Sequence, residues 1–258
     1  MSGSQGAAEA DLYYLHDGLP RQAPGSDAST RRAISALGLL PPHPRALDIG
    51  CGPGRSALML AEQLGAQVTA IDIHQPYLDQ LAADAGLRGV GHLIHCRNLS
   101  MAALDFPREA FDIVWAEGSA YFLGIRESLA AWLPILKPGG CAAFTELCWL
   151  ASSPPREAVD YWRENYPPMT DSRAHLATAA SLGYRILGSF TLPAVDWWDE
   201  YLTPLEARIR QLGSGTPRPG AGLAAQIAES SRAIALFRRY PEAFGYVFHL
   251  VAKPSAAL

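Results

Sequence analysis

The hydrophobic and polar positions of this chain follow two periods. Short apolar runs that end in glycine or aspartate are typical of buried strands, and apolar residues spaced i, i+3, i+4 and i+7 predict helices with one buried face. Ala57, Leu60, Ala61 and Leu64 show the helical spacing. The predicted strands before residue 150 cover residues 46–49, 67–72, 91–96, 111–118 and 141–149. Strands that alternate with helices predict an α/β fold, with a mostly parallel sheet between two layers of helices.

Apolar residues at helical spacing also predict the connecting helices. These cover residues 30–39, 54–66, 75–86 and 127–140. In the last of them we expect Pro134 to kink the helix and the sequence KPGG at residues 137–140 to end it. The sequence PPHP at residues 41–44 ends the first.

After residue 150 the alternation changes. Residues 152–182 and 197–240 are predicted to be helical with proline breaks and to form a cap, and residues 213–222 a flexible loop. Residues 184–192 and 244–252 are predicted strands. Residues 1–30 are rich in Gly, Ser and Pro and predict an arm or lid with one anchored helical turn. We interpret the whole chain, residues 1–258, as one domain with this arm and cap.

Composition narrows the function classes. The chain has 258 residues and a formal net charge of −4, without a basic run, which argues against nucleic acid or an anionic membrane as partner. We expect neither a membrane span nor a secretory signal. The four cysteines mostly lie in apolar runs, which predicts reduced, buried thiols in a cytoplasmic protein. A homodimer is compatible with the sequence, which does not fix the oligomeric state.

The most informative stretch is RALDIGCGPGR, residues 45–55, where a predicted strand runs through Asp48 into three alternating glycines and then into a helix. Glycines allow a sharp turn and a close approach of the backbone to a ligand, and the helix start offers free N–H groups. Asp72 lies 18 residues beyond Gly54, at the end of the second strand. A carboxylate there can accept hydrogen bonds from both hydroxyls of a ribose. Together these features predict a nucleoside site.

These segments resemble motifs I and II of the class I S-adenosylmethionine-dependent methyltransferases. The segments LSMAALDF, FDIVWAEGSAYFL and LKPGGCAAFTEL resemble three further parts of that family's domain. The resemblance covers residues 40–150 well and the two late strands loosely. It implies a Rossmann-like, doubly wound sheet of seven strands, in which a late antiparallel strand inserts beside the fifth, together with the helical cap.

The resemblance also implies S-adenosyl-L-methionine as cofactor and a set of residues that hold it. Those residues are Gly25, Ser26, Asp48, Gly50, Cys51, Gly52, Asp72, Ile73, Ser100, Met101 and Glu117. The segment Pro24-Gly25-Ser26 resembles one that precedes the first helix in a bacterial subgroup and would close over the cofactor. Members of that subgroup often carry Gly-Asp or Gly-Ser where this chain has Leu99-Ser100-Met101. A contact between an aspartate and the adenine amino group is therefore missing at that position.

Substrate contacts are expected from the arm, the loop after the fourth strand, the end of the fifth strand and the cap. The candidates are Tyr14, His16, Tyr121, Trp149 and Trp197, because aromatic faces attract a sulfonium or an amine. His16 would act as a base if the arm covers the methyl group. No other catalytic residue is identified, and the scattered histidines show no metal-binding spacing.

The leading hypothesis is therefore a methyltransferase that transfers a methyl group to a small-molecule acceptor by in-line displacement. Three alternatives stay open at this point. They are a protein or nucleic-acid methyltransferase, a noncatalytic protein that binds S-adenosylmethionine or another nucleoside, and a nicotinamide-dependent oxidoreductase. The spacing of the glycines disfavours the last, because its fingerprint places the third glycine one residue later.

Overall fold

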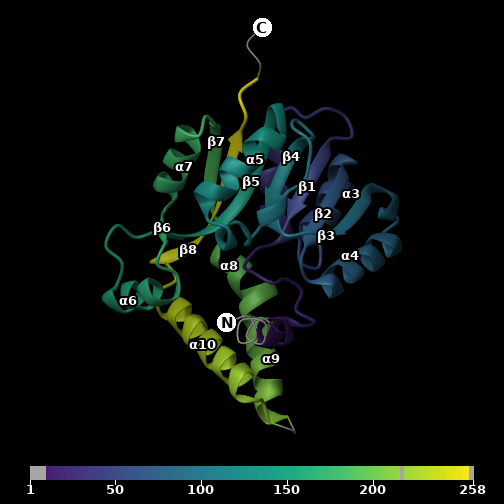
Figure 1. Cartoon of the computed structure of the whole chain (residues 1–258). Coiled ribbons are helices and arrows are strands. Elements are labelled where there is room, and N and C mark those ends of the chain that lie inside the picture. The colour runs from purple at the N-terminus through teal and green to yellow at the C-terminus, as the bar shows by residue number, and fades with distance from the viewer. Residues whose placement is uncertain (1–9, 216–217, 256–258) are drawn as a thin grey trace.

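The computed structural model describes residues 10–215 and 218–255 (Figure 1). One sheet runs through it in the order β3-β2-β1-β4-β5-β8-β7, and β6 pairs with the end of β5. The strands are β1 (Arg45–Ile49), β2 (Gln67–Asp72), β3 (Ile94–Asn98), β4 (Phe111–Ala116), β5 (Leu136–Trp149), β6 (Thr170–Asp171), β7 (Arg185–Thr191) and β8 (Phe244–Ala252).

Strands β1 to β5 are parallel, and β8 inserts antiparallel between β5 and β7. The predicted doubly wound sheet with a late antiparallel strand is thus confirmed. The two-residue β6 was not predicted and raises the strand count to eight among the described residues. The parallel strands end at one edge of the sheet, where open α/β sheets bind ligands.

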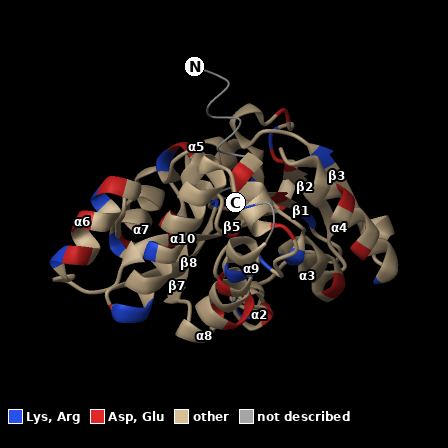
Figure 2. Cartoon of the chain, turned by 90° about the horizontal axis from the view of Figure 1, so that it is seen from below, with Lys and Arg blue, Asp and Glu red and all other residues tan. Residues whose placement is uncertain are grey.

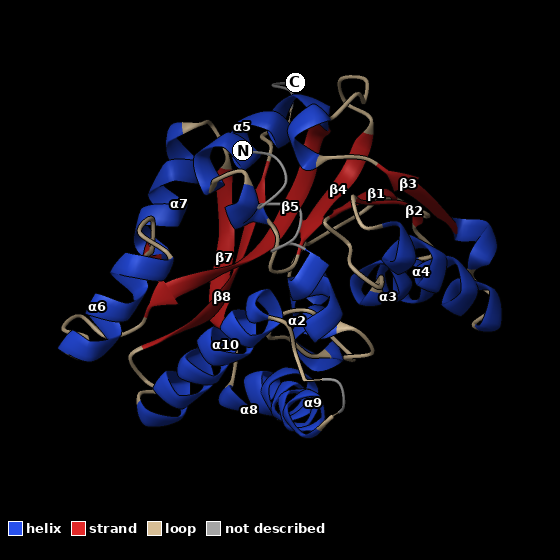
Figure 3. Ribbon diagram, turned by 60° about the horizontal axis from the view of Figure 1, so that its bottom comes forward, coloured by secondary structure: helices blue, strands red, loops and turns tan. Residues whose placement is uncertain are grey.

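Helices cover both faces of the sheet (Figure 3). Buried side chains of α2, α3 and α4 share one core cluster with the sheet, and those of α5 and α7 share a second cluster on the other face. The helices are α2 (Asp27–Ser35), α3 (Arg55–Leu64), α4 (Gln75–Leu87), α5 (Ile125–Ile135), α6 (Arg156–Asn165), α7 (Ser172–Ser181), α8 (Ala194–Trp197), α9 (Thr203–Ser214) and α10 (Ala221–Arg239), with short turns η1 (Gly91–Leu93), η2 (Met101–Ala103), η3 (Ala120–Phe122) and the π-helical η4 (Trp198–Leu202).

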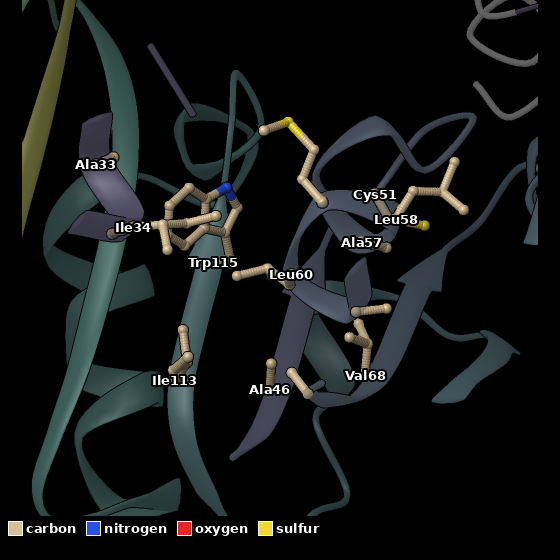
Figure 4. Packing of buried hydrophobic residues seen from close by; sticks show 14 of the residues in the cluster. Ala33, Ile34, Ala46, Cys51, Ala57, Leu58, Leu60, Val68, Ile113 and Trp115 are labelled. Atoms are coloured by element: carbon tan, nitrogen blue, oxygen red, sulfur yellow. The ribbon is translucent and has the colours of Figure 1, made fainter. Parts of the chain in front are cut away.

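Trp115 of β4 shows how the first core cluster is built. Its ring is fully buried, with Ile34 of α2 on one side and Leu60 of α3 on another (Figure 4). Burying an aromatic side chain of this size removes a large apolar surface from water and stabilises the sheet–helix packing. Its indole Nε1 donates a hydrogen bond of 2.9 Å to Glu117, which follows at the end of β4. The core thereby fixes a carboxylate at the ligand-binding edge of the sheet.

The boundary predicted between the helix at residues 127–140 and the fifth strand was misplaced, because the strand begins at Leu136 and not at residue 141. Helix α5 ends at Ile135, with Pro134 in its last turn, and Leu136 already pairs with Phe111 in the sheet. Pro138 has no N–H to donate to the carbonyl of Pro134, as a continued helix would require, whereas Leu136 finds a partner in the neighbouring strand. The register shift between Phe111 and Ile113 accommodates the segment KPGG within β5.

A third core cluster joins the cap to the N-terminal arm. It combines buried residues of α6, η4, α9, α10 and β8 with Leu15 and Leu19 of the arm, whose residues 10–16 are helical. In Figure 1, α9 and α10 extend below the sheet. Residues 152–182 divide between two places, because α6 packs in this cluster whereas Ala179 of α7 packs against the sheet. Within residues 10–215 and 218–255 no helix is long and apolar enough to cross a membrane.

Candidate active site

Two cavities lie beside each other at the carboxyl ends of the strands. The first has a volume of about 420 Å³ and is lined by the glycine loop, the arm and the loops after β2, β3 and β4. The second has a volume of about 280 Å³ and lies between the sheet and the cap. Six residues line both cavities: Gln22, Ala23, Pro24, Gly118, Tyr121 and Tyr201. The two cavities are therefore adjacent parts of one site.

The glycine loop between β1 and α3 needs its glycines for conformation and for space. Gly50 and Gly54 have φ angles of +63° and +87°, which side-chain-bearing residues rarely adopt. A Cβ atom at Gly50 would lie 2.5 Å from the Cβ atom of Ser119, and one at Gly54 would strike Leu81. The loop therefore packs closely against the loop after β4 and against α4, while Gly50, Cys51 and Gly52 line the first cavity.

Asp72 at the end of β2 is tied to this loop. Its Oδ2 accepts a hydrogen bond of 2.9 Å from the backbone N–H of Gly52, and its Oδ1 accepts one of 2.9 Å from the N–H of His74. An ionised carboxylate can accept about four hydrogen bonds, so both oxygens keep lone pairs for further donors. Asp72 also lines the first cavity. The arrangement can bind a diol such as a ribose.

Asp48 lies in the wall behind the loop. Its side chain is 1% exposed and it does not line either cavity. Burial, followed by repulsion from Glu117 and Asp72, raises its pKa well above the usual range, and a backbone hydrogen bond from Ala57 opposes this rise. Its Oδ2 has no hydrogen-bond partner among the described residues. Because Asp48 lines neither cavity, a ligand there would interact with it only through the glycine loop or through a bridging water molecule.

Glu117 lines the first cavity and is held by three donors. Its Oε1 accepts hydrogen bonds from Trp115 Nε1 at 2.9 Å and Thr30 Oγ1 at 2.8 Å. Its Oε2 lies 3.3 Å from Nη1 of Arg21. Glu117, which is expected to help hold the cofactor, is thus already paired with a cation of the arm.

Arg21 was missed by sequence reasoning, because a single arginine in a Pro- and Gly-rich arm gives no signal. It is 6% exposed, and besides Glu117 it binds Asp27 at 2.9 Å and Glu200 at 2.7 Å. Arg55 pairs with Asp27 as well, at 2.7 Å. Partial burial would raise the pKa of Asp27, but Arg55 and Arg21 outweigh it and lower that pKa. This network of two guanidinium groups and three carboxylates joins the arm, α2, β4 and the cap.

The segment expected to contact the adenine, residues 99–102, also lines the first cavity. Ile73, Ser100 and Met101 all line it, and Ser100 also caps the short turn η2. The arm borders the cavity next to them, where the ring of Tyr13 stacks on His74 with centroids 3.9 Å apart. The apolar and aromatic surface on this side suits a flat heterocycle.

Gly25 and Ser26 lie beside the first cavity without lining it. The N–H of Gly25 donates to the carbonyl of Asp196, and Ser26 Oγ caps α2 by accepting a hydrogen bond from Ser29. The space beside Gly25 is filled by Arg21 and Glu117, each 3.3 Å from the position of an added Cβ atom. Gly25 and Ser26 therefore lie beside the network of Arg21, and they do not face the cavity.

Three of the five residues predicted to contact the substrate line a cavity, and two do not. His16 lines the first cavity, Tyr121 lines both and Trp197 lines the second. Tyr14 is 53% exposed under the guanidinium of Arg208, and Trp149 packs edge-on against Phe244, so neither lines a cavity.

His16 is poorly placed to act as a base. Its Nδ1 lies 2.9 Å from the carbonyl oxygen of Leu12 and must donate to it, which leaves Nε2 to accept from the Tyr201 hydroxyl at 3.2 Å. Burial lowers its pKa, and the hydrogen bond to Leu12 opposes this. Both ring nitrogens are therefore used in joining the arm to the cap.

Glu146 is the titratable residue of the site that sequence reasoning did not select. It lies within β5, is 2% exposed and lines the second cavity. Burial raises its pKa to about 7, although a backbone hydrogen bond from Leu147 and the nearby Tyr166 hydroxyl oppose the rise. A glutamate within the apolar strand CAAFTELCW was the available signal, because an unpaired buried carboxylate is costly.

Comparison with known proteins shows what this chain is similar to. A family model described as a methyltransferase domain matches residues 46–140. Malonyl-[acyl-carrier protein] O-methyltransferase of Salmonella typhimurium is 35% identical over 130 residues, which are 50% of this chain and 46% of that protein. This chain spans about half the length of the first curated relatives it matches.

Solved structures agree on the fold. An S-adenosylmethionine-dependent methyltransferase from Geobacter sulfurreducens, in complex with S-adenosyl-L-homocysteine, has a TM-score of 0.80 at 20% identity, over 94% of this chain and 97% of that one. The [4+2]-cyclase SpnF has a TM-score of 0.76 at 22% identity, over 98% and 97% of the two chains. Likeness at these identities shows the fold alone, and the same fold is found in a protein described as a cyclase.

Proposed function

Because residues 46–140 match a model described as a methyltransferase domain, we propose that this protein is a class I S-adenosylmethionine-dependent methyltransferase, which binds S-adenosyl-L-methionine in the first cavity and transfers its methyl group to a small molecule in the second. The observation that carries this proposal is the adjacency of the two cavities. One has the features of a nucleoside site and the other has an aromatic lining beneath the cap.

The residues of the first cavity fit this cofactor. Asp72 keeps lone pairs for the ribose hydroxyls, and Ile73 with Met101 offers an apolar surface to the adenine. The carboxylate of Glu117 and the guanidinium of Arg21 offer charges of both signs to the zwitterionic methionine end. Each of these assignments is a proposal for this chain, supported by the lining of the cavity.

The cofactor supplies a methyl group that its sulfonium already activates. The chain itself then has to align the acceptor and exclude water, which are large contributions to rate in a displacement reaction. The arm and the cap serve both purposes, because Gln22, Ala23 and Pro24 border both cavities and Tyr201 joins the arm through His16. Gly118 leaves room at the junction, since a Cβ atom there would lie 2.6 Å from the Cβ of Ala23.

A small acceptor is favoured over a macromolecule. The second cavity has a volume of about 280 Å³ and is lined by residues of the cap helices, the arm and the sheet, which suits a small acceptor. Figure 2 shows acidic and basic residues interspersed on that side of the chain, as along α6, where Asp160 pairs with Arg156 and Arg163. A nucleic-acid surface would instead concentrate positive charge.

Two measurements test the proposal. Calorimetric titration with S-adenosylmethionine should show one binding site per chain, and incubation with methyl-labelled cofactor and a metabolite extract should give a labelled small product. Absence of cofactor binding would refute the proposal. Binding without label transfer to any extract component would instead favour a noncatalytic role or a reaction such as the cyclisation named for SpnF.

A further inference from the structure

We propose that the second cavity binds a small primary or secondary amine with an apolar or aromatic body, and that Glu146 binds its ammonium group and removes a proton from it. This inference rests on the proposed function, because it names the acceptor for that methyl transfer. It goes beyond that function by excluding acceptors that are anions and by assigning a base.

The first argument is charge. Glu146 is the one charged residue that lines the second cavity within the described part of the chain. Arg21 and Arg55 line the first cavity and are engaged by carboxylates there. An acceptor with a phosphate or a carboxylate would be buried beside a carboxylate without a counter-ion, at a large free-energy cost. A cationic acceptor would instead be attracted by the carboxylate of Glu146.

The second argument is the orphaned oxygen. Oε1 of Glu146 accepts a hydrogen bond of 3.0 Å from the N–H of Leu147. No described residue meets hydrogen-bond geometry at Oε2, although the Tyr166 hydroxyl lies close enough to the carboxylate to lower its pKa. A buried carboxylate oxygen without a donor is unfavourable and calls for one from a ligand. An ammonium group supplies N–H donors and compensates the charge in one contact.

The third argument is the aromatic lining. The cavity is surrounded by the rings of Trp162, Tyr166, Trp197, Phe237, Phe244 and Tyr246. Tyr246 meets Trp197 edge-on with centroids 5.3 Å apart, and Trp197 stacks on Phe237 at 4.2 Å, so the lining is rigid. Aromatic faces attract a cation by about 0.5–2 kcal/mol each and also bury an apolar body. Nε1 of Trp162 also lacks a partner among the described residues and can donate to an oxygen on that body.

The proton and electron balance is complete with the groups named. The ammonium gives one proton to Oε2 of the ionised Glu146, which frees the nitrogen lone pair. That lone pair forms the N–C bond to the methyl carbon, while the electron pair of the breaking S–C bond stays on sulfur. The products are the methylated ammonium ion and S-adenosylhomocysteine, and the proton on Glu146 is released to solvent. A folded-state pKa of about 7 allows Glu146 to gain and lose this proton near neutral pH.

Calorimetry with matched probes tests the inference. Phenethylamine, N-methylphenethylamine, tyramine and 2-cyclohexylethylamine are titrated into the protein saturated with S-adenosylhomocysteine, each beside its alcohol and carboxylate isosteres. We expect at least one amine to bind 10-fold or more tightly than both its isosteres. Glu146→Gln should abolish that preference and leave the affinity for S-adenosylhomocysteine unchanged, whereas Glu164→Gln, at an exposed position of α6, should change neither.

A second measurement, the release of protons on amine binding, uses the wild-type protein alone. Since an ammonium ion ionises a half-protonated carboxylate, amine binding at pH 7 should release a fraction of a proton, which appears as a different binding enthalpy in buffers of different ionisation enthalpy. The inference is overturned if no amine outbinds its isosteres, or if the preference survives in Glu146→Gln. Failure of S-adenosylhomocysteine itself to bind would instead refute the proposed function.

Discussion

The backbone N–H of Gly52 donates a hydrogen bond of 2.9 Å to Oδ2 of Asp72, so the two features that define the proposed nucleoside site hold each other in place. The glycine loop follows β1, and the carboxylate ends β2, its parallel neighbour. Asp72 therefore shapes the loop before any ligand binds. The same carboxylate is expected to accept the ribose hydroxyls.

Asp72→Ala should weaken binding of S-adenosylmethionine by about 10- to 100-fold, because hydrogen bonds to a charged group contribute roughly 1.5–3 kcal/mol. Calorimetric titration measures the change. Asp79→Ala removes an exposed carboxylate of α4 outside both cavities and should leave the affinity unchanged. Equal affinities for Asp72→Ala and the wild-type protein would contradict the assigned role of Asp72.

Gly50→Ala should destabilise the fold more than the same change at Gly18. Both positions have positive φ angles, +63° and +74°, so each alanine costs about 1–2 kcal/mol of backbone strain. Only Gly50 adds a collision, with its Cβ 2.5 Å from that of Ser119, whereas nothing lies within 4 Å of an added Cβ at Gly18. The free energies of unfolding of both variants, measured in urea, separate backbone strain from the collision. Equal losses in the two variants would show that the loop moves enough to avoid the collision.

Arg21→Met should loosen the arm and weaken cofactor binding. Removing one partner of a buried ion pair costs roughly 3–5 kcal/mol. We expect about 1–3 kcal/mol here, because Asp27 and Glu200 are each 32% exposed and water screens them. Urea unfolding and limited proteolysis of residues 10–24 measure the loosening of the arm, and calorimetric titration with S-adenosylmethionine measures cofactor binding. Arg31→Met, at an exposed position of α2, is the control, and a similar proteolysis rate in both variants would argue against the network.

The stability of the protein should carry a pH dependence from Glu146. Its pKa is about 7 in the folded chain against an ordinary value of 4.5, so between these values the folded state binds more protons than the unfolded state. This contribution is present below pH 4.5 and is lost as the pH rises through 7. It amounts to about 3 kcal/mol in total.

Urea unfolding at pH 5 and pH 8 tests this sign. Glu146→Gln should lose less stability between the two pH values than the wild-type protein does, and Glu242→Gln, at an exposed position, should match the wild type. Burial lowers the pKa of His175 to about 4 and that of His249 to about 3, which favours the opposite trend in all three proteins. That shared trend cancels in the comparison, and an unchanged slope in Glu146→Gln would show that Glu146 is ionised in the fold.

The sequence by itself determined the doubly wound sheet, most of its strands and the position of the glycine loop and Asp72 at one edge of it. Strand β1, the glycines and Asp72 are local patterns, and parallel strands bring their carboxyl ends to one edge without further information. Local patterns also explain the error at residues 137–140, since they could not show that Leu136 finds a partner in Phe111.

Only the tertiary structure decided what surrounds the acceptor. Arg21 gains its role from three carboxylates that lie 6, 96 and 179 residues further along the chain. Glu146 gains its raised pKa from the cap that encloses it, and Tyr14 loses its expected role because its ring lies outside both cavities. These properties depend on burial and on contacts between distant segments, which no local period of hydrophobic and polar residues encodes.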